Sequence, residues 1–382
     1  MVSAIGWLRG VRRVAAATGM LRDRTACAVR RLERVLATEA RASFEASGVP
    51  GLAVVVRFAD GPVLRASFGR ATSGRAPADA PMTTDTVVQA FSLSKVVVAW
   101  CAMALAERGV VALDEPVWRH LGGWRLPPDR AAGADLERVT LRRLLSHGAG
   151  FGPFEPGFCD PGKRPSALDL LRRDGPPGAR LSIDAPPGAT YRYAAGGFVL
   201  AEAVLEGATG RAYADLAHDL VLGPLAMTAT SFAQTAAAVP RLATPHDPEN
   251  RPLPFRPMRT LAASGMLASA EDLATLFAAL SPGAAGVPAG RGLLTPASCA
   301  EMLRPQSRKG GGSDYGLGVY VRRKRADLRY AHSGHYVGWY GHADGFVRRR
   351  IVAVMLTNGD RGRACVEPLM RRLRAVIYDT VL

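Results

Sequence analysis

The feature that most restricts the fold of this chain is the placement of strand-like segments near both of its ends. Residues 51–69, "GLAVVVRFADGPVLRASFG", predict two strands around a turn at Asp60 and Gly61. Strand patterns return late in the chain, at 315–321, 328–332, 338–343 and 351–358. A last amphipathic helix is expected over about 364–380. Both ends can therefore contribute to one sheet, and the middle of the chain is left to form an inserted lobe.

The middle of the chain, from about residue 115 to 305, is rich in Pro, Gly and Ala and carries short helical patterns at 141–146, 198–210 and 270–280. We therefore expect an α+β fold, with an antiparallel sheet flanked by helices and a mostly helical lobe inserted into it. The expected divisions are an Arg-rich extension and helix over 1–47, a catalytic domain over 48–382, a sheet lobe from 48–115 and 306–382, and a helical lobe from 116–305.

The segment "SLSKVVVAWCAMALAERG", residues 92–109, predicts a helix, because Ser92 suits its start and Gly109 its end. Lys95 is one of four lysines in the chain and precedes the apolar run 96–106. One turn apart, the hydroxyl and the amine share a helix face. Burial favours the neutral amine, which can activate a hydroxyl as a nucleophile. The alternative is a helix-capping serine with a lysine whose amine reaches out to water.

Two distant segments contain the other groups that acyl transfer needs. Tyr193 stands just before a helix-like segment, and a phenol near a lysine can relay protons to a leaving group. A strand is expected to end at residues 332–334. Beyond it, the backbone N–H of His335 can join that of Ser92 to form an oxyanion hole.

Several segments, taken in order, resemble the serine β-lactamase and penicillin-recognising hydrolase superfamily. The resemblance is closest to its class C-like branch, which includes D-alanyl-D-alanine carboxypeptidases and family VIII carboxylesterases. Ser92 and Lys95 match its S-x-x-K motif, Tyr193 heads its Y-x-N motif, and residues 332–334 stand for K-T-G or H-x-G. Further similar segments are "GVPGLAVVV" (48–56), "ALDEPVWRHL" (112–121), "VTLRRLLSHGAGF" (139–151), "LGPLAMTAT" (222–230) and "SGMLASAEDLA" (264–274). The resemblance runs from about residue 48 to the end and implies a β-lactamase/transpeptidase-like fold.

The resemblance also implies a mechanism. Ser92 would attack a carbonyl and form an acyl-enzyme, while Lys95 and Tyr193 share the proton transfers, and which of them is the base stays open. Substrate contacts are expected from the third motif and a following aromatic residue: His332, Ser333, Gly334 and Trp339. Core packing is the alternative for the indole, and a structural hydrogen bond is the alternative for the imidazole. No cofactor or metal is expected, because the sequence has no H-E-x-x-H or Cys/His pattern.

Departures from the family pattern narrow the expected activity. Ala195 replaces the Asn of the second motif, which in β-lactamases and peptidases helps to hold the substrate amide. Ala149 and Ala226 replace Ser and Gly in segments expected to be structural, and His147 of the L-L-x-H segment is expected to be structural as well. We therefore expect a carboxylesterase-like enzyme acting on a small-molecule ester. The alternatives are a β-lactamase or D,D-peptidase acting on a lactam or amide, a biosynthetic acyltransferase, and a non-catalytic binding protein.

Composition adds expectations about partners and compartment. The net charge is +16, but the basic clusters at 322–325 and 348–350 lack interleaved aromatics, so we expect surface charge and no nucleic-acid partner. Arg9, Arg12 and Arg13 interrupt any apolar export signal, and the five cysteines are scattered, which favours a cytoplasmic location. No apolar run reaches the roughly 20 residues of a membrane span. The oligomeric state stays open.

Overall fold

The computed structural model describes most of the chain. The described residues are 21–58, 61–72, 79–155, 157–160, 162–176, 178–234, 241–284 and 286–379. The Arg-rich stretch before residue 21, and Asp60 of the expected turn, lie outside them.

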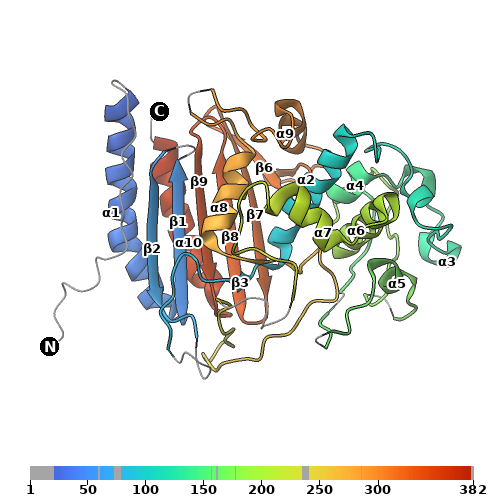
Figure 1. Cartoon of the computed structure of the whole chain (residues 1–382), viewed down its shortest axis with the longest axis horizontal. Coiled ribbons are helices and arrows are strands. Elements are labelled where there is room, and N and C mark those ends of the chain that lie inside the picture. Colours follow the sequence, from blue (N-terminus) through green and yellow to red (C-terminus); the bar gives the residue numbers. More distant parts are fainter. Residues whose placement is uncertain are drawn as a thin grey trace.

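One antiparallel sheet combines strands from both ends of the chain (Figure 1). Its order is β2-β1-β9-β8-β7-β6-β5, so β9, which comes last in sequence, lies between β1 and β8. The strands are β1 (Gly51–Phe58), β2 (Val63–Gly69), β5 (Asp314–Tyr315), β6 (Tyr320–Lys324), β7 (Asp327–Tyr336), β8 (Trp339–Phe346) and β9 (Ile351–Thr357). This arrangement confirms the expected α+β fold with a sheet built from the two ends of the chain.

Helices cover both faces of the sheet, because its strands bury side chains on both sides. In β1, Leu52, Val54 and Val56 belong to one apolar cluster, whereas Ala53 and Val55 belong to the other. The first cluster is completed by α1 (Leu21–Ser47) and α10 (Gly362–Asp379). The second is completed mainly by α8 (Ala270–Ala279) and α2 (Ser94–Glu107), which Figure 1 shows on the opposite side from α10.

The helix α1 shares the core of the sheet, and this bears on the expected division at residue 47. Its buried residues Leu32, Leu36 and Ala40 pack in the same cluster as β1 and α10. The part of the expected extension that the structure describes is therefore a layer of the same body. Whether residues 1–20 form a separate extension stays a prediction.

The inserted lobe is mostly helical and lies at the β6 end of the sheet, where Figure 1 shows α3 to α7 grouped together. Its elements are η2 (Val117–His120), α3 (Pro128–Ala131), η3 (Leu136–Arg138), α4 (Leu141–Leu145), α5 (Ala167–Arg172), α6 (Ala195–Thr209), α7 (Tyr213–Ala217) and the π-helical turn η4 (His218–Leu222). The short strands β3 (Val88–Gln89) and β4 (Leu267–Ala268) and the helix α9 (Pro296–Met302) complete the chain. Across the described residues, no helix is both long enough and apolar enough to span a bilayer.

Candidate active site

The predicted nucleophile lies in a short turn that precedes the helix. Ser92 belongs to the 3₁₀ turn η1 (Phe91–Leu93), and α2 begins at Ser94 rather than at Ser92 as the sequence predicted. Phe91 adopts a φ of +44°, a left-handed conformation that is costly for a residue with a side chain. Such strain persists only where neighbouring contacts fix the backbone, and it gathers at functional sites.

Contacts with a distant segment fix this turn. The Ser94 hydroxyl donates to the Phe91 carbonyl at 2.5 Å and accepts the N–H of Met266 at 3.0 Å. The N–H of Ala90 donates to the Met266 carbonyl at 2.8 Å. The apolar body of α2, buried from Ser94 to Leu105, anchors the other side of the turn in the core. The turn is therefore clamped between the segment at Met266 and the centre of the molecule.

The structure brings Ser92, Lys95 and Tyr193 together at one atom. The Tyr193 hydroxyl lies 2.8 Å from Ser92 Oγ, and Lys95 Nζ lies 3.2 Å from the same oxygen. Nζ also donates to the carbonyl of Ala263 at 2.7 Å. Lys95 is 1% exposed, whereas Ser92 is half-buried and can be reached from outside. This is the geometry that a hydroxyl nucleophile and its proton-transfer partners require.

Burial moves the pKa values of the amine and the phenol in opposite directions. Desolvation lowers the pKa of Lys95 to about 7, and the negative charge of Glu155 offsets part of that effect. Desolvation raises the pKa of Tyr193 above its ordinary value, although hydrogen bonding of the phenol oxygen with the Ser92 hydroxyl opposes the change. Near neutral pH, a sizeable fraction of the amine is thus unprotonated while the phenol keeps its proton.

His147 supports Tyr193, which is a role that sequence reasoning left out of the site. The two rings lie 4.2 Å apart between centroids, and His147 Nδ1 accepts the backbone N–H of Ala194 at 3.1 Å. Burial, and next the charge of Lys95, hold the pKa of His147 well below its ordinary value, so the ring is neutral. The sequence feature that could have indicated this role is the position of His147 in the L-L-x-H segment. The expectation of a structural role agrees with this contact, but the structure places the role beside the reacting groups.

Glu202 of α6 supports the contact that Lys95 makes with Ala263. Its carboxylate accepts the backbone N–H groups of Leu261 and Ala262, at 3.1 and 2.9 Å. It is fully buried, and Arg164 lies 3.5 Å from its other oxygen. Burial raises the pKa of Glu202 to about 7. The carboxylate therefore orients the backbone of residues 261–263, whose last carbonyl accepts the hydrogen bond from the Lys95 amine. The sequence did not predict this role, because the neighbours of Glu202 in the chain are apolar.

The third predicted motif lies on β7, beside the nucleophile turn. A Cβ atom on Gly334 would come within 2.0 Å of the Ala90 carbonyl oxygen and 3.3 Å of Ser92 N, so only glycine lets the strand approach this closely. β6 pairs with β7 only as far as Ala331, which leaves the edge of residues 332–336 free of β6. His335 is exposed and is the next residue after Gly334 on this edge.

His332 lies in the interior of the site and is held by its neighbours. Its Nδ1 lies 2.7 Å from the carbonyl oxygen of Ser333, and its Nε2 lies 2.9 Å from the hydroxyl of Tyr315. Burial, and next the charge of Lys95, lower the pKa of His332 to about 3, so the ring is neutral. Tyr191 and Tyr320, whose hydroxyls lie 3.1 Å apart, extend the same aromatic cluster. Sequence reasoning missed these three tyrosines, because nothing in the sequence indicated that the segment 315–321 and the residues just before Tyr193 meet at His332.

Two other predicted features have a plain structural setting. Trp339 is 2% exposed and packs in the main apolar cluster, which corresponds to the core-packing alternative rather than to an open pocket wall. Ala195, where the family pattern has Asn, is the first residue of α6 and follows directly on Ala194. Within the described residues, no group of three or more His, Cys, Asp or Glu side chains is arranged to hold a metal ion.

Comparison with known proteins agrees with this geometry. Residues 29–375 match the Beta-lactamase family. Penicillin-binding protein 4 from Amycolatopsis lactamdurans is 29% identical over 341 residues, which cover 85% of each chain. Esterase EstB from Burkholderia gladioli is 32% identical over 191 residues, or 46% of each chain. The D-amino acid amidase from Ochrobactrum anthropi SV3 superimposes with a TM-score of 0.69 at 21% identity, covering 92% of this chain and 99% of that one.

The chain belongs to the Beta-lactamase family. It is accordingly an enzyme of the serine hydrolase type, and the superfamily inferred from the sequence motifs is confirmed.

Proposed function

We propose that this enzyme is a carboxylesterase-like serine hydrolase that works through an acyl-enzyme on Ser92. The observation that carries the proposal is the convergence of the Tyr193 hydroxyl and the Lys95 amine on Ser92 Oγ, at 2.8 and 3.2 Å. Two proton-transfer groups of different acidity at one hydroxyl are what nucleophilic acyl transfer needs.

The pKa values of the two groups support the following proton transfers. Lys95, with a pKa near 7, is the general base that accepts the proton of Ser92 as its oxygen attacks the ester carbonyl. Tyr193, with its raised pKa, keeps its proton until it hands it to the leaving alkoxide. The resulting phenolate regains a proton from the ammonium of Lys95 through a water molecule, because Ser92 Oγ is by then acylated. Water then enters, attacks the acyl-enzyme with the same groups as base and acid, and releases the carboxylic acid.

The oxyanion of the tetrahedral intermediate is assigned to the backbone N–H groups of Ser92 and His335. The close approach of Gly334 to Ser92 N supports this assignment, because it sets the free edge of β7 against the nucleophile turn. Removing one such donor typically costs about 2.7–4 kcal/mol of transition-state stabilisation. Ser333 and the backbone of Gly334 then form the wall that the substrate meets on this side, and the buried ring of His332 supports this strand from within.

Ester substrates are favoured because the second motif lacks its carboxamide. Ala195 has only a methyl group with which to meet a substrate, so an amide or lactam N–H and C=O would go without that hydrogen-bond partner. An unmade hydrogen bond to a buried polar group costs about 1–3 kcal/mol, and an ester, with no N–H, loses less of it.

The direct test is hydrolysis of p-nitrophenyl butyrate by the wild type, Ser92→Ala and the matched variant Ser43→Ala, whose serine is on α1. We expect turnover by the wild type and by Ser43→Ala, and a loss of roughly a thousandfold or more in Ser92→Ala. A fluorophosphonate probe should label the peptide that contains Ser92, as read by mass spectrometry. Absence of both turnover and labelling in the wild type would refute the proposal.

A second candidate is a D,D-peptidase or β-lactamase activity, and the 29% identity to a penicillin-binding protein over 85% of the chain favours it. It requires acylation of Ser92 by a lactam at a rate that competes with the ester. Nitrocefin hydrolysis with a kcat/KM equal to or above that for p-nitrophenyl butyrate would replace the esterase assignment with this one. Transfer of the acyl group to an added alcohol, instead of to water, would identify an acyltransferase.

A further inference from the structure

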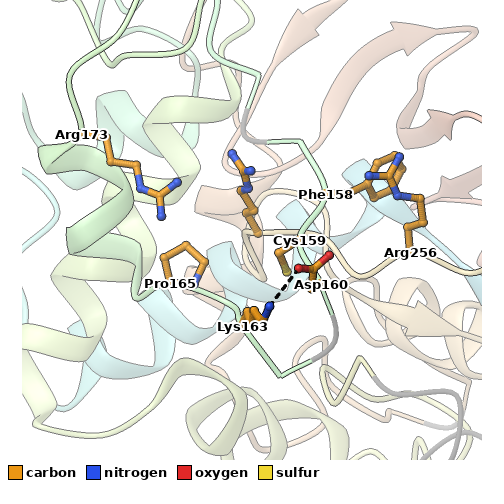
Figure 2. Close-up of a pocket in the computed structure, with 8 residues that line it drawn as sticks. Phe158, Cys159, Asp160, Lys163, Pro165, Arg173 and Arg256 are labelled. Atoms are coloured by element: carbon orange, nitrogen blue, oxygen red, sulfur yellow. Dashed lines mark hydrogen bonds and ion pairs between the residues drawn. The ribbon is translucent and has the colours of Figure 1, made fainter.

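Half of the residues that line a pocket of about 240 Å³ near the catalytic turn are cationic. We call it the arginine pocket, and its lining residues are Phe158, Cys159, Asp160, Lys163, Pro165, Arg173, Arg256 and Arg259. Figure 2 shows Arg173 and Arg256 on opposite sides of the pocket, with Cys159, Asp160 and Lys163 between them. Three arginines and one lysine thus face a single carboxylate.

The guanidinium groups of this pocket are available to a ligand. Asp160 pairs with Lys163 at 3.3 Å, in an ion pair whose two side chains are about three-quarters exposed and which is therefore weak. In the part of the chain that the structure describes, Arg173, Arg256 and Arg259 form no ion pair with an acidic side chain. Many other arginines of this protein form such ion pairs, for example Arg142 with both Asp114 and Glu301.

The pocket is firmly built. Phe158 and Met258 form a backbone bridge, the N–H of Cys159 donates to the Pro257 carbonyl at 2.9 Å, and the N–H of Arg259 donates to the Gly157 carbonyl at 3.1 Å. Arg256 lies over the ring of Phe158, 4.7 Å from its centroid, which limits the orientations of its guanidinium group. Arginines held by backbone pairing and ring stacking lose less conformational entropy when they bind an anion.

A row of aromatic rings connects the pocket to the nucleophile turn. The ring of Phe158 lies 5.2 Å from that of Tyr336, and the ring of Tyr336 lies 5.5 Å from that of Phe91. Phe91 immediately precedes Ser92, and Tyr336 immediately follows His335. These contacts place the arginines and the reactive serine within the span of one substrate of moderate length.

We propose that the arginine pocket binds a carboxylate or phosphate carried by the substrate whose ester carbonyl reacts at Ser92. The inference rests on the proposed esterase function and narrows its substrates to esters with a distal anionic group. Arginine forks match the oxygens of both groups, and the aromatic residues between the pocket and Ser92 suit an apolar spacer.

The test compares esters of equal chain length. The probes are p-nitrophenyl octanoate, the mono-p-nitrophenyl ester of suberic acid, and the p-nitrophenyl ester of 8-phosphonooxyoctanoic acid. We expect kcat/KM for at least one anionic ester to exceed that for the octanoate by about tenfold or more, as one good charged hydrogen bond supplies. The ester with the larger preference identifies the anionic group.

Variants separate the pocket from the general positive charge of the protein. In the double variant Arg256→Gln/Arg259→Gln, the preference for the anionic ester should fall at least tenfold. This is the decrease expected when one or more charged contacts are lost. Arg259→Lys should keep part of the preference, because it retains the charge without the fork. Arg323→Gln, which removes one exposed charge of β6 outside the pocket, should leave the preference as it is in the wild type.

The outcomes distinguish the two proposals. Failure of all three esters to acylate Ser92 would overturn the esterase proposal and, with it, this inference. Turnover of all three at equal kcat/KM would overturn the anion pocket alone. A preference that persists in the double variant, or falls equally in Arg323→Gln, would also overturn it, since the attraction would then come from overall charge. Fluorophosphonate labelling of each variant shows that its active site is folded.

Discussion

Lys95 is the residue on which both activity and stability depend. It is 1% exposed at the start of an apolar helix, and its amine finds two oxygen partners, Ser92 Oγ and the Ala263 carbonyl. Water would solvate the ammonium better than these two groups do, so the folded protein favours the neutral amine. The segment alone left open a lysine whose amine reaches out to water, and the other matching motifs favoured the buried amine.

The first prediction concerns the pH dependence of ester hydrolysis. Since the pKa of Lys95 lies near 7, kcat/KM for a neutral ester should rise about tenfold per pH unit below that value and level off above it. A pH series with p-nitrophenyl butyrate, measured with a pH-independent detection wavelength, checks this. A rising limb centred near pH 10 would instead contradict the lowered pKa of Lys95.

The second prediction is that Lys95→Met is inactive but more stable at neutral pH. In the wild type, holding the pKa of Lys95 near 7 instead of 10.5 costs on the order of 5 kcal/mol of folding free energy, and the variant avoids this cost. The variant also leaves the Ala263 carbonyl without its hydrogen-bond donor, which reduces its gain by about 1–3 kcal/mol. Between pH 7 and 10.5 the unfolded chain binds the extra proton, so the wild type gains stability as pH rises. Urea unfolding at pH 7 and pH 9.5 should show the advantage of the variant shrinking at the higher pH. An advantage that stays constant or grows would contradict the assigned pKa.

At the scale of the elements, the site depends on how closely β7 approaches the turn η1. The third prediction is that Gly334→Ala lowers kcat/KM for esters by about a hundredfold, because a Cβ atom 2.0 Å from the Ala90 carbonyl forces strand and turn apart by a fraction of an ångström or more. Gly175→Ala is the matched control, since its Cβ meets nothing closer than 3.4 Å. Equal activity of the two variants would show that this approach does not position the site.

The elements also mark the limit of prediction from sequence. The two N-terminal strands, the helix after Ser92 and the strands expected at 328–332, 338–343 and 351–358 follow from local patterns and lie near their expected places. The single strand expected over 315–321 was wrong, because the chain turns at 316–319 and forms β5 and β6, which pair with each other. The contacts of Glu202 with the backbone at Leu261 and Ala262, and of Tyr315 with His332, join segments that share no pattern. Trp339 shows the same limit, because its position after the third motif could not reveal that β8 is buried on both faces.

At the scale of the whole molecule, α1 closes one face of the sheet. The fourth prediction is that Leu32→Ala lowers the free energy of unfolding by about 2–5 kcal/mol, because Leu32 is fully buried between α1 and the cluster formed by α10 and β1. Arg31→Ala, one position earlier and exposed, should change it by less than about 0.5 kcal/mol. Denaturant titration measures both, and equal effects would mean that α1 is not a layer of the core.

The central position of β9 has a consequence for how the chain is made. Residues 351–357 insert between β1 and β8, which are separated by almost the whole sequence. While a ribosome is still synthesising the chain, both of those strands present open backbone edges, and such edges attract other chains. A frameshift or premature stop upstream of residue 351 would therefore yield an aggregation-prone fragment rather than a smaller enzyme. Binding of a chaperone to the nascent chain would protect these edges until residues 351–357 have been synthesised.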